Sequence, residues 1–264
     1  MSVALIAEPR TTWDAWPRDS SGELLVGGRP LSVAVKAVGG TPCYLYDRER
    51  LTQRYELLRK SVPARTHFHY AIKANPMPAV VCHMARLVEG LDVASAGELR
   101  VALDSGMVSD RISFAGPGKT VEELEQAVAA GVLINVESFR EIRILTKISE
   151  QLGVTARVAV RANLPFELRA SGMKMAGGAR QFGIDAEYMP DMLDKIAASG
   201  LNFEGFHLFA GSQNLKASAI VEAQTKSYEL ALQWCDLAPG PLRSLNLGGG
   251  FGIQYNHTDK PLDI

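Results

Sequence analysis

Residues 67–76 read His67-Phe68-His69-Tyr70-Ala71-Ile72-Lys73-Ala74-Asn75-Pro76, a short apolar strand that ends in a lysine and is stopped by Asn-Pro. An ammonium group at the end of a buried strand loses solvation, which favours the neutral amine, a nucleophile toward carbonyl carbon. The alternative is a lysine that extends from the strand end into water. This stretch alone fits both interpretations, and the rest of the chain decides between them.

From this stretch onward the chain alternates short apolar strands with helices. Strands are expected at residues 67–73, 91–95, 112–115, 132–137, 156–162, 203–209 and 244–247. Helices are expected at residues 77–89, 96–106, 121–130, 139–152, 187–199 and 215–235, with a long glycine-rich loop at about 163–185. Capping boxes mark three helix starts, namely Ser95…Glu98, Thr120…Glu123 and Ser138…Glu141.

Repeated β-α units require parallel strands joined by right-handed crossovers. Seven strands follow the pattern, one fewer than a closed eight-stranded barrel has. The predicted fold is therefore α/β, a parallel (β/α)8 TIM-type barrel that lacks its last strand. An open doubly wound sheet is the competing topology, but no Gly-x-Gly-x-x-Gly follows an early strand.

Three segments are expected along the chain. Residues 1–21 are interpreted as an N-terminal extension, residues 22–38 as a strand segment with a turn at Gly27-Gly28, and residues 39–264 as the barrel domain. The barrel domain begins with a β-prone run at residues 43–46, followed by a helix that Asp47 caps and that ends near residue 60.

Composition limits the classes of function. A chain of 264 residues with 47% hydrophobic and 22% charged residues is typical of globular proteins. The net charge of −1 argues against nucleic acid or a membrane surface as a partner, and no apolar run is long enough to span a bilayer. Residues 1–10 lack the pattern of a signal peptide, and three widely spaced cysteines favour a cytoplasmic protein with reduced thiols.

Polar and glycine residues gather at the predicted strand ends, which meet at one mouth in a parallel barrel. They are Lys73, Asp92, Ser95, Arg161, Asn163, His207, Gly211-Ser212 and Gly248-Gly249-Gly250. The glycine triplet, placed before a presumed helix, suits a phosphate site, and a plain turn is the alternative. His207 is either a core histidine or a flat ring that covers an aromatic cofactor. His67 and His69 share a strand face without a third ligand, so no metal site is expected.

Several motifs in consistent order over residues 22–255 resemble the pyridoxal-phosphate-dependent amino-acid decarboxylases with an alanine-racemase-like barrel, the group of diaminopimelate, ornithine and arginine decarboxylases. These motifs are Gly40-Thr41-Pro42, Tyr44-Leu45-Tyr46-Asp47, Tyr70-Ala71-Ile72-Lys73-Ala74-Asn75, Asp92-Val93-Ala94-Ser95-Ala96-Gly97-Glu98-Leu99, Arg161-Ala162-Asn163, Gln181-Phe182-Gly183-Ile184, Gly205-Phe206-His207, Gly211-Ser212-Gln213 and Leu247-Gly248-Gly249-Gly250-Phe251-Gly252.

The resemblance implies α-decarboxylation of a diaminopimelate-like or related diamino acid by a cytoplasmic homodimer that uses pyridoxal 5′-phosphate. Lys73 would hold the cofactor as a Schiff base and His207 would stack on its ring. Ser212 and the glycines Gly248, Gly249 and Gly250 would hold its phosphate. Asp92, Glu98 and Arg161 match positions that line or support the pocket.

The chain departs from the family pattern in three places. The histidine and serine motif is expanded to His207-Leu208-Phe209-Ala210-Gly211-Ser212, and Gln181 replaces a lysine before Phe182-Gly183. These features, with the run 172–175, resemble a subgroup linked to exosortase-associated polysaccharide export or secondary metabolism. The chain also stops at Ile264, before the eighth strand and the C-terminal β domain of the family, with which residues 22–31 would pair. Little activity is therefore expected from residues 1–264 alone.

Two other functions remain open. One is an amino-acid racemase on the same barrel, although the glycine-triplet and Ser-Ala-Gly-Glu motifs resemble the decarboxylase branch. The other is a non-catalytic carrier of pyridoxal phosphate, which a short chain would suit. Release of carbon dioxide would separate decarboxylation from both.

Overall fold

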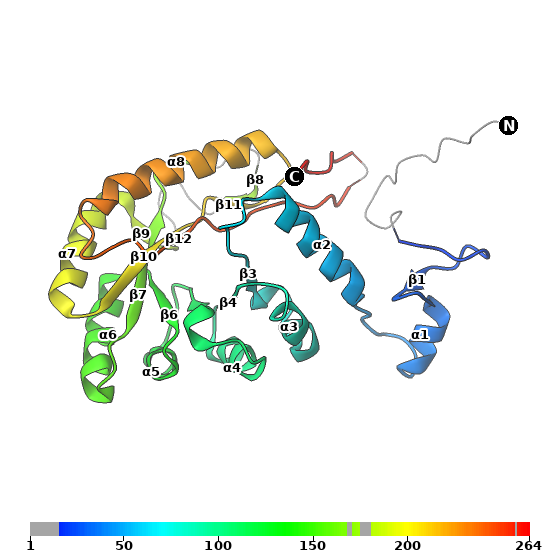
Figure 1. Cartoon of the computed structure of the whole chain (residues 1–264), viewed down its shortest axis with the longest axis horizontal. Helices are drawn as coiled ribbons and strands as arrows, with labels where there is room; N and C mark the ends of the chain where they lie inside the picture. Colours follow the sequence, from blue (N-terminus) through cyan, green and yellow to red (C-terminus); the bar gives the residue numbers. More distant parts are fainter. Residues whose placement is uncertain (1–15, 168–170, 175–180, 257) are drawn as a thin grey trace.

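A computed structural model describes residues 16–167, 171–174, 181–256 and 258–264, and for residues 171–174 it describes the backbone alone. Seven parallel strands lie in the order β12-β10-β7-β6-β5-β4-β3 and curl into a half-barrel, with helices on its outer side (Figure 1). These strands are β3 His69–Ala71, β4 Gly90–Val93, β5 Ile112–Phe114, β6 Leu133–Val136, β7 Arg157–Asn163, β10 Asn202–Leu208 and β12 Ser244–Asn246. The predicted parallel strands and the partial TIM-type barrel are confirmed.

The helices follow the strands in the predicted alternation. They are α2 Arg48–Ser61, α3 Pro78–Met84, α4 Ala96–Asp104, α5 Val121–Ala130, α6 Phe139–Leu152, α7 Met189–Ser199 and α8 Ala217–Cys235. Short 3₁₀ turns lie at Ile72–Ala74, Ser109–Arg111 and Ala186–Tyr188. No helix in the described part of the chain has the length and apolar character needed to cross a membrane.

Local side-chain hydrogen bonds explain where these helices begin. The side chains of Ser95, Thr120 and Ser138 each accept a hydrogen bond from the backbone N–H three residues later. Only Thr120 forms the complete reciprocal capping box with Glu123. The carboxylates of Glu98 and Glu141 instead accept from the N–H of the residue before the cap, at 2.8 Å and 2.7 Å, so each joins its helix to the preceding strand end.

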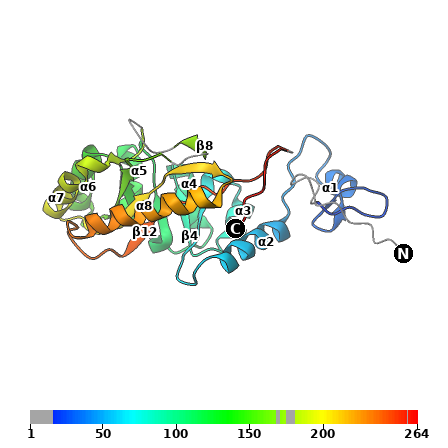
Figure 2. The same ribbon diagram turned by 90° about the horizontal axis from the view of Figure 1, so that it is seen from above.

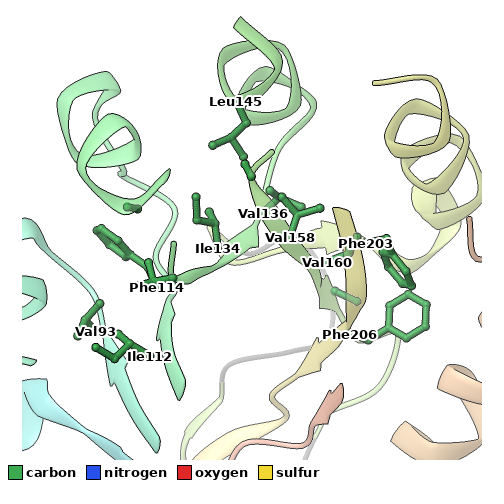
Figure 3. Close-up of a cluster of buried hydrophobic side chains, with 14 of the residues drawn as sticks. Val93, Ile112, Phe114, Ile134, Val136, Leu145, Val158, Val160, Phe203 and Phe206 are labelled. Atoms are coloured by element: carbon green, nitrogen blue, oxygen red, sulfur yellow. The ribbon is translucent and has the colours of Figure 1, made fainter. Parts of the chain in front are cut away.

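The hydrophobic core lies between the strands and the outer helices. Figure 3 shows its side chains, which come from alternate positions of the central strands; Ile112, Phe114, Ile134, Val136 and Val158 are all fully buried. Leu145 of α6 packs into the same cluster. At the end near α8, the ring centroids of Phe203 and Phe206 lie 5.4 Å apart, and Trp234 lies 5.5 Å from Phe206. The opposite face of each strand is therefore free to carry polar groups.

The N-terminal segment differs in part from its prediction. Strands β1 Leu25–Val26 and β2 Arg29–Pro30 pair around the expected Gly27-Gly28 turn, where both glycines have positive φ. Residues Leu31–Ala37, expected to belong to the strand segment, form helix α1. Figures 1 and 2 show this hairpin and helix beside α2, apart from the half-barrel. Of the predicted extension, residues 1–15 lie outside the described residues.

Two predictions about strands are wrong. The run 43–46 is not a strand: Tyr44 is 89% exposed, and β-prone side chains form a strand only where a neighbouring strand pairs with them. The second is the glycine-rich loop at about 163–185, which contains strand β8 Ser171–Lys174, paired antiparallel with β11 Gly211–Asn214. The predicted glycine-rich loop also contains β9 Ile184–Asp185, which pairs with β7. Parts of that loop, residues 168–170 and 175–180, and Met175 of the subgroup motif lie outside the described residues.

Candidate active site

The inner face of the half-barrel carries polar side chains from neighbouring strands. Asp92 of β4 lies opposite Ser113 of β5, and the Ser113 hydroxyl donates to the Asp92 carboxylate at 2.5 Å. Asn135 of β6 donates to Ser113 Oγ at 3.4 Å. These residues alternate with the core residues along each strand, so they point away from the helices. A chain of hydrogen bonds thus crosses three strands on the inner face.

His207 of β10 pairs in register with Arg161 of β7, and several charged groups of the site act on its pKa. Burial and the positive charges of Arg161 and Lys73 lower the pKa of His207 to about 4, although Asp92 and Glu137 act in the opposite direction. The ring is therefore uncharged at neutral pH. Its Nδ1 atom is buried and makes no hydrogen bond within the described part of the chain. A flat, neutral ring with a free polar edge suits contact with another planar group.

Arg161 lies beside His207, because the two residues are paired in the register of β7 and β10. Its Nη1 atom lies 3.1 Å from Oε1 of Glu137, and the arginine and glutamate side chains are 9% and 2% exposed. The guanidinium carbon lies 4.8 Å from the ring centroid of Phe182. A buried cation is thus held in one orientation next to the neutral histidine.

Asp92 and Glu98 have partners within the fold. Burial alone would raise the pKa of Asp92, but hydrogen bonds from His69, at 3.0 Å, and from Ser113 hold that pKa below its ordinary value. Asp92 therefore stays ionised and adds negative charge near His207. Glu98 lies at the start of α4, where its carboxylate accepts the Ala94 N–H, so its contact in the structure is with the backbone.

Lys73 lies outside strand β3, although the sequence predicted it as the last residue of that strand. The strand ends at Ala71, and Lys73 belongs to the 3₁₀ turn Ile72–Ala74 that follows. The residue is exposed, which agrees with the alternative interpretation of a lysine that extends from the strand end into water. The charge of Lys73 also contributes to the lowered pKa of His207.

Strand β11, which contains Ser212, lies beside the glycine triplet. The Asn214 N–H donates to the Gly250 carbonyl at 2.9 Å, and the Gly252 N–H donates to the Asn214 carbonyl at 2.8 Å. Any side chain at Gly250 would collide with the Gly211 carbonyl, and one at Gly248 would collide with the Phe209 ring. The helix expected after the triplet is absent from described residues 251–256 and 258–264. The Gly248 N–H donates to Asn246 Oδ1 at 2.8 Å, so the N–H groups of Gly249 and Gly250 are the candidate anion ligands of this loop.

These features fit pyridoxal 5′-phosphate. A partly buried, uncharged histidine, whose buried Nδ1 has no hydrogen-bond partner among the described residues, suits one face of an aromatic ring. The crowded glycine loop next to Ser212 offers backbone N–H groups and a hydroxyl, which are phosphate ligands. Lys73 provides a primary amine whose charge acts on the pKa of that histidine.

Sequence reasoning missed Ser113, Asn135 and Glu137. Each is at most 6% exposed, and each makes a hydrogen bond to a residue of another strand or loop. Their signal was present as single polar residues within apolar strands, at the alternate positions that face inward. By contrast Lys119, in the glycine-rich run 116–120, forms a buried ion pair with Glu141 at 3.0 Å, which is a structural contact. Thr120 is a helix cap, as predicted.

A family model described as "Pyridoxal-dependent decarboxylase, pyridoxal binding domain" matches residues 48–264. The chain is 35% identical over 230 residues to the L-glutamyl-[BtrI acyl-carrier protein] decarboxylase of Niallia circulans, covering 85% of this chain and 53% of that protein. It is 34% identical over 248 residues to the diaminopimelate decarboxylase of Zymomonas mobilis, covering 91% and 58%.

Solved structures agree with these matches. The crystal structure of diaminopimelate decarboxylase from Helicobacter pylori, complexed with L-lysine, superposes with a TM-score of 0.77 at 30% identity and covers 86% of this chain and 59% of that one. AQ1208 from Aquifex aeolicus superposes with a TM-score of 0.79 at 32% identity and covers 94% and 58%. The chain therefore spans a little over half the length of the relatives it matches.

Proposed function

This chain belongs to the pyridoxal-dependent decarboxylase family and carries its pyridoxal-binding domain, and we propose that the protein is a carboxy-lyase that removes the α-carboxyl group of an amino acid as carbon dioxide. The observation that carries the proposal is the partly buried His207, which pairs in register with Arg161 and is uncharged at neutral pH because burial and the charges of Arg161 and Lys73 lower its pKa. This arrangement supplies an amine for a carbonyl cofactor and a flat surface for its ring.

Each predicted residue has a place in the proposal. Lys73 would hold the cofactor aldehyde through its amine, with release of water, and the uncharged ring of His207 would lie against the cofactor ring. Ser212 and the N–H groups of Gly249 and Gly250 would bind the phosphate, and Gly248, whose N–H donates to Asn246 Oδ1 at 2.8 Å, would shape the loop. Arg161, Asp92 and Glu98 set the charge and shape around these groups. Pyridoxal phosphate, when bound, supplies an electron sink for the electron pair left behind by the departing carboxylate.

The proposed substrate is diaminopimelate or a related diamino acid. Diaminopimelate decarboxylases are among the relatives named above, and the relative from Niallia circulans acts instead on a glutamyl group attached to an acyl-carrier protein. A protein-bound aminoacyl group is therefore the second substrate class to test. The proposal includes a cytoplasmic homodimer; the three free cysteines support a reducing compartment.

The test reconstitutes the protein with pyridoxal phosphate and offers it a panel of amino acids that includes diaminopimelate, ornithine, arginine and lysine. Wild-type protein is expected to develop the visible absorbance of covalently bound cofactor and to release carbon dioxide from one member. Lys73→Ala is expected to abolish both signals. Lys60→Ala, which changes an exposed lysine on α2, is the matched control and should keep both.

The same measurements separate the alternatives. A racemase would interconvert the enantiomers of an amino acid without releasing carbon dioxide. A cofactor carrier would show the absorbance and neither reaction. The relatives named above are decarboxylases, which favours the first outcome. Full absorbance in Lys73→Ala would contradict the assignment of the amine.

A further inference from the structure

We propose that Glu137 is a positioning residue of this site: its carboxylate ties two loops at the mouth of the half-barrel to the end of β6 and orients Arg161 beside His207. The inference rests on the proposed function for its effect on the cofactor. The geometry on which it stands is independent of that function.

Glu137 shares its two carboxylate oxygens among three donors. Oε1 accepts from Nη1 of Arg161 at 3.1 Å and from the Gly116 N–H at 2.6 Å. Oε2 accepts from the Gly183 N–H at 3.0 Å. The side chain is 2% exposed, so these bonds are strong and little weakened by water.

The three donors come from separate parts of the chain. Gly116 lies in the loop after β5, Arg161 lies on β7, and Gly183 precedes β9. Glu137 itself follows the last residue of β6. One carboxylate therefore holds together the ends of adjacent strands, where a parallel barrel places its active site.

The loop that contains Gly183 packs closely on the same arginine. Gly183 has a φ of +76°, and an added Cβ would lie 2.8 Å from the backbone of Ala162, so the loop can approach β7 only with glycine at this position. The preceding residue, Phe182, presents its ring to the Arg161 guanidinium at 4.8 Å. Glu137 thus fixes Arg161 directly and also fixes the loop that covers it.

Loss of this carboxylate is expected to change the surroundings of His207. Glu137→Gln leaves Arg161 buried without a counter-charge, which is unfavourable, so the guanidinium is expected to leave its place beside the histidine. The new amide group would also present N–H toward one of the three donors. Both effects disturb the surface proposed to hold the cofactor ring.

The chain offers a matched control on β7, the strand that carries Arg161. Arg157 of β7 pairs with Glu204 of β10 through two hydrogen bonds, at 2.6 Å and 2.9 Å, near the start of these strands. The Glu204 side chain is 10% exposed, so Glu204→Gln also breaks a largely buried ion pair. This ion pair lies at the N-terminal end of β7, whereas Arg161 lies near its C-terminal end at the mouth of the half-barrel.

The experiment compares Glu137→Gln, Glu204→Gln and wild type in full-length protein. Amide hydrogen exchange at Gly116 and Gly183 is expected to become at least about ten-fold faster in Glu137→Gln and to stay unchanged in Glu204→Gln. The dissociation constant for pyridoxal phosphate is expected to rise about ten- to hundred-fold in Glu137→Gln alone. Glu137→Asp, which keeps the charge but shortens the reach, should give intermediate values and serves if the glutamine variant does not fold.

A double-mutant cycle tests whether Glu137 acts through Arg161. If it does, Glu137→Gln combined with Arg161→Gln should weaken cofactor binding no more than Arg161→Gln alone. Fully additive losses would overturn the proposal, as would equal losses in Glu137→Gln and Glu204→Gln. If wild-type protein binds no pyridoxal phosphate, the proposed function fails. The exchange rates of the two glycines still decide whether Glu137 holds the loops.

Discussion

Asp92 and His69 form a hydrogen-bonded pair whose stability depends on pH. Burial would lower the pKa of His69, but its hydrogen bond to Asp92 and the charge of that carboxylate raise the pKa above its ordinary value. The pKa of Asp92 is held below its ordinary value. Each folded-state shift favours the charged form, so the ion pair stabilises the folded protein where both groups are charged.

The sign of each shift fixes the pH window. The contribution of His69 is complete below about pH 6.5 and is lost as the pH rises through its raised folded-state pKa. The contribution of Asp92 is complete above about pH 4 and is lost as the pH falls through its lowered pKa. Between these limits Asp92→Asn should lower the free energy of unfolding by about 1 kcal/mol, a value reduced by partial exposure of both side chains.

Denaturant unfolding of wild type and Asp92→Asn across pH 4 to 9 measures this difference, and nuclear magnetic resonance titration of His69 checks its cause. The pKa of His69 should fall in the variant, and the gap in stability should narrow above neutral pH. An equal gap at pH 5 and pH 9 would contradict the assignment to this pair.

Single site residues could be proposed from the sequence only where the residue type and its position at a strand end pointed to the site by themselves. Asp92, Arg161 and His207 could be proposed because charged or aromatic polar residues at strand ends are conspicuous in sequence. Glu137 could not be recognised as their partner, because its contacts with Gly116 and Gly183 depend on strand register and on how two loops fold back. The exposure of Lys73 likewise depends on the turn that follows β3.

Among the helices, α5 shows how a local signal controls an element. Thr120 Oγ1 accepts the Glu123 N–H at 3.2 Å, and the Glu123 carboxylate accepts the Thr120 N–H at 3.0 Å. Thr120→Ala should lower the free energy of unfolding by about 1 kcal/mol, because two N–H groups at the helix start lose their local arrangement. Thr120→Ser keeps the hydroxyl and should remain within about 0.5 kcal/mol of wild type. Chemical denaturation measures both; equal losses would show that the methyl group, and not the cap, is responsible.

Helices that have a capping residue at the start and a glycine after the end were predicted with both of their ends correct. Helices α5 and α6 begin at capping residues and end before Gly131 and Gly153, which adopt the left-handed conformation favoured by glycine. Strand β11 and the run 43–46 show the opposite case. A strand forms only when it pairs with another strand, and the sequence of Gly211–Asn214 does not indicate pairing with β8. The run 43–46, which includes Tyr44, has no such pairing partner in the described part of the chain and therefore does not form the predicted strand.

Over the whole molecule, the two faces of the curved sheet divide stability from chemistry. The outer face supplies the apolar core against the helices, as Figure 3 shows. The inner face supplies the hydrogen-bonded chain from Asp92 to Asn135 and the pair of Glu137 with Arg161. This division was predictable in outline from the β-α alternation, because helices must cover one face of parallel strands. Because of this division, consecutive residues of one strand alternate between the hydrophobic core and the polar inner face.

Ile134 and Asn135 provide the sharpest comparison, since they are consecutive on β6 and face opposite sides. Ile134 is fully buried in the core, so Ile134→Ala should lower the free energy of unfolding by about 2–5 kcal/mol. The dissociation constant of the folded protein for pyridoxal phosphate should stay within about two-fold, because the inner face keeps its side chains. Asn135 makes two long hydrogen bonds of 3.4 Å, to Ser113 and to the Phe114 carbonyl, so Asn135→Ala should cost only about 1 kcal/mol of stability.

Asn135→Ala should nevertheless weaken cofactor binding several-fold, because Ser113 then loses a partner and its hydrogen bond to Asp92 is no longer oriented from both sides. Unfolding curves combined with cofactor titrations, recorded at a temperature where both variants are folded, give the two quantities separately. The expected pattern is a crossover: the larger loss of stability belongs to Ile134→Ala and the larger loss of affinity to Asn135→Ala. If one variant is worse in both measurements, the core and the site are coupled through β6, and the two faces of the sheet do not act independently.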